Sequence, residues 1–290
     1  MDKAIYERLA PITEEERAIL DGSGIDRSIY MGGDRDVITG KKLLSPGKLI
    51  DIRPHTRFIR FPKHSHDYVE MVYMLSGSTT HFINRTKIVL EEGELLILGQ
   101  DAIQEILPAG ETDIAINFIV RPEFFSLTLD FLGSEDTPLR DFIVRAICGD
   151  NPSGFLLFRV SDVKPVQNLI ENLIWTVISE TPNRRSINQL TMGLLFVQLL
   201  NHTDKLTVDK KEQETIVKVL GYIEENYLSG SLSEIASILH YDPAWLSREI
   251  KRRTGRTYTE LCQEKRLSQA AWLLTNTDEN VSDIAAAVGY

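Results

Sequence analysis

Cysteine is scarce in this sequence. Cys148 and Cys262 are the only two cysteines among 290 residues, and they fall in separate helical segments. A disulfide scaffold or a structural zinc site needs several cysteines, or cysteines and histidines, at short regular spacings. Both classes are therefore excluded, and we expect the two thiols to be buried and inert.

The chain also lacks net positive charge and long hydrophobic runs. Forty-two acidic against 32 basic residues give a net charge of −10, so a nucleic acid would have to bind a local basic patch. No apolar run approaches the roughly 18 residues of a membrane span. The acidic, amphipathic start MDKAIYERLAPITEEERAIL is unlike a secretory signal. We therefore expect a cytoplasmic protein with no membrane partner.

Short β-rich segments occupy residues 43–120. Gly, Pro, Asn or Glu-Glu-Gly turns separate them, and the segments are KLIDIRPHTRFIRFP, YVEMVYMLSGSTTHFIN, KIVLEEGELLILG and DIAINFIV. Regular short strands of this kind predict a barrel or a sandwich.

The apolar spacing becomes helical after about Pro122. Residues 163–180 repeat apolar side chains on one helical face, whereas residues 186–202 are apolar nearly all round. Because one small domain does not need to cover every side of a helix, we expect residues 186–202 to form a subunit interface in a homodimer. Packing inside one domain is the alternative.

Helix-capping signals define a pair of short helices after the polar stretch 202–214. Ser231 and Glu234 form a capping-box pattern that starts the first helix. Asp242 can cap the second, with Pro243 at its first position and Gly255 at its end. Two short helices joined by a tight turn are typical of a helix-turn-helix motif.

The second of these helices has one apolar and one basic side. Leu246 and Ile250 lie one turn apart and can anchor it to a core. The opposite stripe comprises Ala244, Ser247, Arg248, Lys251 and Arg252. Arg248 can offer two donors to guanine, while Lys251 and Arg252 suit phosphates. This pattern predicts a recognition helix for the major groove of double-stranded DNA, and a plain solvated face is the alternative.

Two further segments complete a family pattern. RTYTELCQEKRLSQAAWLLTNT opens with a capping box and has helical apolar spacing, and NVSDIAAAVGY repeats the start of the first helix pair. With SLSEIASILHYDPAWLSREIKRRTG, residues 215–290 resemble the DNA-binding domain of the AraC/XylS family of transcription regulators. The resemblance implies two helix-turn-helix units joined by a long helix, with base-reading positions at Ala244, Ser247 and Arg248 and with Pro243 and Trp245 nearby.

The chain departs from that family pattern at three places. His240 stands where the turn often has glycine, which is tolerable because the left-handed conformation is reachable outside glycine. Glu249 takes an often apolar position, and we expect it to be partly exposed. The sequence ends at Tyr290, where a second recognition helix would begin. We therefore expect a fragment, in which Val281, Ile284 and Val288 have no partner to cover them.

A histidine-rich stretch marks the expected barrel. His64, His66 and Glu70 fall on one side of a continuous strand and could form a facial triad for a divalent metal. Their spacing to Gly77 resembles the first motif of the cupin superfamily, and EEGELLILGQDAIQ resembles the second. The resemblance places Gln104 where metal-binding cupins have their last histidine, and an amide is a poor substitute for imidazole. We expect a metal-free pocket in which His64, His66, Glu70 and Gln104 bind an effector.

Together these patterns predict an α+β chain. Its parts are an N-terminal extension (1–42), a cupin-like effector-sensing barrel (43–121), a helical dimerisation segment (122–204) and an all-α helix-turn-helix DNA-binding domain (211–290) with an incomplete second unit. In AraC-like regulators the barrel senses a small molecule, often a sugar or a related metabolite. We expect a transcription regulator without cofactor or enzymatic activity. The alternatives are a metal-dependent cupin enzyme, such as a dioxygenase or isomerase, and a truncated dimerisation partner that does not read DNA.

Overall fold

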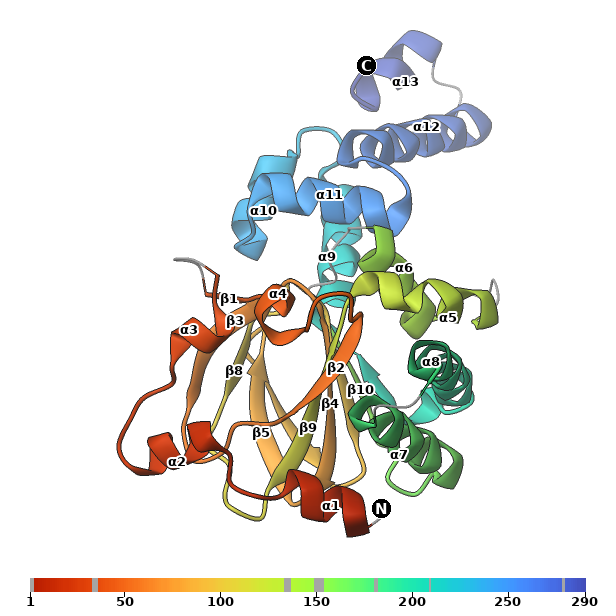
Figure 1. The fold of residues 1–290 in the computed structure, drawn as a ribbon. Coiled ribbons are helices and arrows are strands. Elements are labelled where there is room, and N and C mark those ends of the chain that lie inside the picture. Colours follow the sequence, from red (N-terminus) through yellow and green to blue (C-terminus); the bar gives the residue numbers. More distant parts are fainter. Residues whose placement is uncertain are drawn as a thin grey trace. The chain divides into compact units, whose positions relative to one another are not determined.

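The computed structural model describes residues 3–32, 36–132, 137–148, 154–179, 182–208, 210–277 and 280–290 (Figure 1). The chain divides into two compact units, residues 1–208 and 209–290. The first unit is mainly β-sheet with helices, and the second is helical, so the predicted α+β class is confirmed.

Two sheets form the barrel of the first unit. The five-stranded sheet has the order β1-β3-β8-β5-β6, and the six-stranded sheet has the order β11-β10-β7-β4-β9-β2. The strands are β1 (Val37–Ile38), β2 (Ile50–Pro54), β3 (Phe61–His66), β4 (Val69–Ser76), β5 (Ser78–Ile83), β6 (Thr86–Glu91), β7 (Leu95–Leu98), β8 (Gln104–Ile106), β9 (Ile114–Val120), β10 (Phe155–Phe158) and β11 (Leu206–Val208). The short strands expected between residues 43 and 120 are present, and β10 and β11 add two that the pattern did not indicate.

Local backbone chemistry explains the turns between these strands. Asn84 and Arg85 both have positive φ, 49° and 71°, and join β5 to β6 as a two-residue hairpin whose twist matches the strands. Gly93, before β7, has φ +78°, and a Cβ there would lie 2.7 Å from the Ser161 Cβ. Only glycine fits this turn without displacing the chain at residue 161.

The N-terminal residues pack against the barrel. They form α1 (Lys3–Leu9), α2 (Glu14–Leu20), α3 (Arg27–Tyr30) and α4 (Gly40–Leu43), while β1 pairs with β3 in parallel. Arg57 Nε donates to Glu16 Oε1 at 2.7 Å, and both side chains are almost fully buried. This paired charge ties α2 to the segment that follows β2, since either charge alone would be costly in that position.

Helices cover one face of the six-stranded sheet. They are η1 (Pro122–Phe125), α5 (Ser126–Phe131), α6 (Pro138–Cys148), α7 (Lys164–Ile178), α8 (Arg184–Leu200) and the short η2 (Thr203–Lys205). One apolar core joins Met71 and Phe118 of the sheet to Ile170 of α7 and Phe196 of α8. The opposite face of α8 leaves Ile187, Leu190 and Leu194 42%, 53% and 51% exposed.

The second unit consists of five helices in its described residues. They are α9 (Lys210–Asn226), α10 (Leu232–Leu239), α11 (Pro243–Thr254), α12 (Tyr258–Asn276) and α13 (Val281–Ala287). Their common core contains Val219, Ile223, Ile235, Leu246 and Ile250.

The predicted caps of this unit are present. Ser231 accepts from the Glu234 amide at 3.2 Å, and Asp242 accepts from the Trp245 amide at 2.9 Å. Thr257 and Glu260 form a complete capping box. These local bonds satisfy amide donors that the helix starts would otherwise leave unpaired.

The expectation that the apolar face of α13 is uncovered was wrong for two of its three residues. Ile284 and Val288 are 2% and 1% exposed, so α13 covers most of its apolar face within the unit, and only Val281 stands out at 70%. Arg266 of α12 helps to hold this end, because it donates to the carbonyls of Tyr227, Leu228 and Gly289. These three bonds link the end of α13 to α12 and to the turn before α10.

The cysteines differ from each other in their environment. Cys262 is buried in the core of the second unit, as predicted, whereas Cys148 at the end of α6 is exposed. The described helices include none with the length and apolarity required to cross a bilayer.

Candidate functional site

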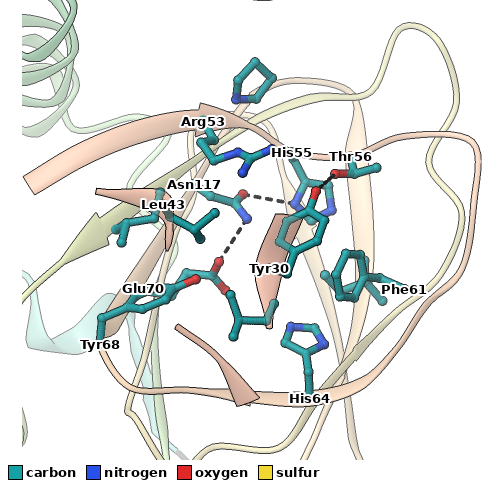
Figure 2. Close-up of a pocket in the computed structure, with 14 residues that line it drawn as sticks. Tyr30, Leu43, Arg53, His55, Thr56, Phe61, His64, Tyr68, Glu70 and Asn117 are labelled. Carbon is teal, nitrogen blue, oxygen red and sulfur yellow. Dashed lines mark hydrogen bonds between the residues drawn. The ribbon is translucent and has the colours of Figure 1, made fainter. Parts of the chain in front are cut away.

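A cavity lies inside the barrel unit (Figure 2). Its lining residues are Tyr30, Ile38, Leu43, Arg53, Pro54, His55, Thr56, Phe61, His64, Tyr68, Glu70, Ile106, Asn117 and Ile119. The space open to the centre of a water-sized sphere is about 40 Å³. A water needs roughly 10 to 15 Å³ on this measure, so the cavity holds about three waters or a very small molecule.

The four residues predicted to bind an effector lie close together. His64 and Glu70 line the cavity, while His66 and Gln104 are buried next to it. His64 of β3 pairs in register with Gln104 of β8, and the rings of His64 and His66 are 5.0 Å apart. The sequence motif therefore located a real cluster, and its role in binding remains a prediction.

These residues do not fit a metal ion. His64 Nδ1 bonds to the Pro62 carbonyl at 2.7 Å, which leaves Nε2, and Gln104 Nε2 bonds to His81 Nδ1 at 2.8 Å, which leaves only an amide oxygen, a weak ligand for a transition metal. Within the described parts of the chain, no three His, Cys, Asp or Glu side chains gather closely enough to hold a metal. The facial triad considered for His64, His66 and Glu70 is not formed.

Three further polar residues in the barrel were not indicated by the motif. Asn117 of β9 donates from Nδ2 to Glu70 Oε1 at 2.9 Å, and its Oδ1 lies 3.0 Å from His55 Nδ1 (Figure 2). His81 of β5 bonds to Thr79 at 2.8 Å and to Gln104. The available signal was a polar side chain inside an otherwise apolar strand, as in IAINFIV.

Burial keeps the ionisable groups of this cluster neutral. It lowers the pKa of His64 to about 4 and raises the pKa of Glu70 to about 8. Burial also lowers the pKa values of His55, His66 and His81. His66 Nε2 lies 3.6 Å from Glu70 Oε2, but at neutral pH this is a contact of two uncharged groups and not an ion pair.

An outer hollow shares three lining residues with the cavity, and Tyr30 contacts two of them. The Tyr30 hydroxyl donates to Glu15 at 2.7 Å and lies 3.2 Å from the Thr56 hydroxyl. Arg53 stands over the Tyr30 ring, 5.0 Å from its centre, and its Nη2 is 3.4 Å from Glu15. Arg53, Pro54 and Thr56 line both spaces, so this group of side chains lies between them.

The second candidate surface is the outer face of α11. Pro243, Ala244, Arg248 and Lys251 are exposed, and Ser247 is half-buried. Leu246 and Ile250 are fully buried, which confirms the predicted orientation of the helix. The side chain of Arg252 lies outside the described residues.

Two side-chain contacts beside this surface determine which groups it presents. Trp245 stacks on Tyr241 with ring centres 4.5 Å apart, which fixes the start of α11. Glu249 is only 5% exposed and accepts from Arg253 Nε at 3.2 Å, so the expectation of an exposed Glu249 was wrong. Its pairing with Arg253 compensates for burial of the carboxylate. The outer face of α11 therefore presents Arg248 and Lys251 without a carboxylate from position 249.

Comparisons with known proteins follow the same division of the chain. The family "AraC-like ligand binding domain" matches residues 49–194, and the family "Helix-turn-helix domain" matches residues 235–290. The chain is 22% identical over 248 residues to the HTH-type transcriptional activator RhaS of Pectobacterium atrosepticum, covering 83% of this chain and 84% of the relative. It is 26% identical over 239 residues to the HTH-type transcriptional activator RhaR of Mannheimia succiniciproducens, with 79% of each chain covered. Among solved structures, ToxT from Vibrio cholerae matches at 14% identity with a TM-score of 0.37, covering 83% of this chain and 88% of that one.

Proposed function

This chain belongs to the AraC family of transcription regulators, and on that premise we propose that a small molecule in the barrel cavity controls DNA binding by the outer face of α11. The observation that carries the proposal is the orientation of α11. Its apolar residues are buried and its basic stripe is free to enter a groove. A short helix presented in this way suits the major groove of double-stranded DNA.

The residues of α11 divide by role in this proposal. Pro243 and Ala244 at the start of the helix allow close approach to base edges, and Ser247 and Arg248 read bases. Lys251 and Arg252 contact phosphates, which contributes affinity for any sequence. Such a local basic face is sufficient even though the whole chain carries a net charge of −10.

Control by the effector is proposed to be a shift between populations of the chain. A ligand changes an equilibrium only to the extent that it binds one state more tightly than another. His64, His66, Glu70 and Gln104 are proposed to provide that preference, since a ligand in or beside the cavity would change their hydrogen bonds. The state it favours presents α11 differently to DNA.

We further propose that the protein acts as a homodimer in the cytoplasm. Exposed Ile187, Leu190 and Leu194 form one stripe on α8, which supports a self-complementary contact between two copies. Two copies would place two α11 helices on two half-sites of DNA, so that their contacts add.

Neither rival function is favoured by a specific observation. A metal-dependent enzyme would need a ligand set, and the described residues contain no group of three His, Cys, Asp or Glu side chains placed to hold a metal. A dimerisation partner that does not read DNA would not need the basic stripe of α11 to face outward. We therefore propose a regulator without catalytic activity.

A direct test measures DNA binding by the full chain. Fluorescence anisotropy with labelled duplexes should show saturable binding that weakens steeply with salt. A triple variant with Ala at Ser247, Arg248 and Lys251 should bind at least about tenfold more weakly, because it loses several base and phosphate contacts. A His66→Ala variant should bind DNA normally without effector and respond differently to it. Unchanged binding by the triple variant would contradict the proposal.

A further inference from the structure

Two residues that line the barrel cavity, His55 and Glu70, each have a buried side-chain atom without a hydrogen-bond partner. Asn117 Nδ2 donates to Glu70, so Asn117 Oδ1 must accept from His55 Nδ1. Because burial keeps the His55 ring neutral, the ring carries a single N–H and its Nε2 holds a free lone pair. His55 Nε2 is buried and has no hydrogen-bond partner.

His64 and Glu70 add further acceptor atoms to the same cavity. His64 Nδ1 donates to the Pro62 carbonyl, so in the neutral ring Nε2 carries the lone pair. Glu70 Oε2 is buried without a hydrogen-bond partner, and the Glu70 side chain is 4% exposed. The empty site holds Glu70 as a neutral acid, but a cation bound beside it favours the carboxylate, whose two oxygens both accept. Unpaired buried polar atoms destabilise a fold, so their presence in one cavity points to a ligand that supplies donors.

Two of the donor residues that line the cavity, Tyr30 and Arg53, are already bonded to Glu15. The Tyr30 hydroxyl donates to Glu15, and Arg53 pairs with the same carboxylate. An anionic ligand would therefore meet the lone pair of His55 Nε2 and would have to compete with Glu15 for Arg53.

We propose that the cavity binds a small primary amine in its ammonium form, whose N–H groups donate to His55 Nε2, His64 Nε2 and Glu70. An ammonium has three donors and no acceptor, which matches this set of atoms. The aromatic rings of Tyr30, Phe61 and Tyr68 also line the cavity, and ring faces attract cations. This inference rests on the proposed function, because it names the chemical class of the effector.

The size of the cavity limits the hydrocarbon part of the ligand. Space for about three waters accommodates a short alkyl chain and not a monosaccharide, unless side chains move. The apolar lining residues Ile106 and Ile119 provide contacts for such a chain. The sugar suggested by the family resemblance is thus replaced by a smaller, charged ligand.

Three probes of the same shape test this inference. Propylamine, 1-propanol and propionate share a three-carbon chain and differ in the polar group. Calorimetric titration of the full chain at neutral pH should show that propylamine binds at least about tenfold more tightly than 1-propanol, because hydrogen bonds to a charged donor are roughly twice as strong. Propionate should not bind. Equal affinities, or a preference for the alcohol or the acid, would overturn the inference.

Two matched variants connect the preference to Glu70. Glu70→Gln keeps a carbonyl acceptor but cannot ionise, so it should bring the affinities for propylamine and 1-propanol within about threefold, because the attraction between ammonium and carboxylate is lost. Glu105→Gln changes a carboxylate on β8 that pairs with Arg60 outside the cavity, and it should leave the preference unchanged. If Glu70→Gln does not fold, the comparison of the three probes on the unmodified chain still tests whether the cavity prefers an amine.

DNA binding without ligand separates this inference from the proposed function. A chain that binds DNA but does not prefer propylamine would overturn only the inference that the ligand is an amine. A chain that prefers propylamine but does not bind DNA would overturn only the proposed function.

Discussion

At the scale of single residues, Glu70 and the buried histidines give the barrel opposite dependences on pH. The pKa of Glu70 rises from 4.5 to about 8 on burial, so its contribution to stability is present below pH 4.5 and is lost as pH rises toward 8. The pKa of His64 falls from 6.5 to about 4, so its contribution is present above pH 6.5 and is lost as pH falls toward 4. Burial lowers the pKa values of His55, His66 and His81 as well, so acid should destabilise the barrel most.

Glu70→Gln should flatten the alkaline side of this profile. Between pH 6.5 and 8 the unmodified barrel unit should lose roughly 2 kcal/mol of unfolding free energy, at about 1.4 kcal/mol per pH unit for one proton. The variant has no carboxyl at that position and should lose much less. Urea unfolding followed by circular dichroism at the two pH values measures this, with Glu105→Gln as the control. Parallel losses in all three proteins would show that Glu70 does not titrate in this range.

Lys251→Ala should weaken DNA binding for every sequence. The side chain is exposed on the outer face of α11, where it suits a phosphate. Removing one phosphate contact should reduce the slope of log affinity against log salt by about 1. Anisotropy titrations at several salt concentrations give this slope, and Lys87→Ala on β6 of the barrel is the control. A slope equal to that of the control would remove Lys251 from the interface.

Sequence patterns located some residues of the cavity and missed others for a physical reason. His64, His66, Glu70 and Gln104 belong to a motif with fixed spacing, so they could be identified from one stretch and its partner. His81 and Asn117 are single polar residues in separate strands, and His55 directly follows β2. Only the pairing of distant strands brings these three residues into one cluster, and pairing of that kind is not encoded in local spacing.

At the scale of elements, the turn between α10 and α11 stores backbone strain. His240 ends α10 in the left-handed conformation, with φ 58° and ψ 40°. Gly255 ends α11 with φ +71°, and no atom lies within 4 Å of a Cβ built there. Both helix ends therefore have a left-handed backbone, but one is occupied by glycine, which suits this conformation, and the other by histidine, which does not.

Replacing His240 by glycine and Gly255 by alanine should change the unfolding free energy of the helical unit in opposite directions. His240→Gly should raise the unfolding free energy of the helical unit by about 1 kcal/mol, because glycine adopts positive φ without steric cost. Gly255→Ala should lower it by a similar amount, about 1 kcal/mol, through backbone strain alone. Thermal unfolding of both variants measures the two shifts. A destabilised His240→Gly would show that the His240 side chain contributes more than its backbone strain.

Helix boundaries were predictable where capping residues specify them. The helix start predicted after Ser231, the start predicted at Pro243 and the capping box predicted in RTYTELC agree with the structure, because each cap depends on residues within one turn. β10 and β11 were missed because each is short and depends on pairing with a distant strand. Burial of Ile284 and Val288 was missed because it depends on tertiary packing of α13 within its unit.

At the scale of the whole molecule, assembly is expected to depend on α8. Leu190 and Leu194 are about half exposed while the other face of α8 is buried, so changing them should not unfold the barrel unit. A chain carrying both Leu190→Glu and Leu194→Glu should be a monomer, because two like charges would be desolvated at a symmetric contact.

Size-exclusion chromatography with light scattering measures the molar mass of the protein in solution and so distinguishes a monomer from a dimer. Ile103→Glu is the control, since Ile103 is 52% exposed on the barrel unit and lies outside α8. The control should remain a dimer. A double variant of unchanged dimeric mass would place the interface elsewhere.

The central claim is that the outer face of α11 reads DNA sequence. Selection of binding sites from a random pool of duplexes by the full chain, followed by affinity measurements on single base-pair variants of the selected site, tests it most directly. We predict that one sequence is enriched and that Arg248→Ala reduces discrimination at one base pair by roughly 1 to 3 kcal/mol. A pool without enrichment, or an Arg248→Ala chain that discriminates every position as the unmodified chain does, would contradict the claim.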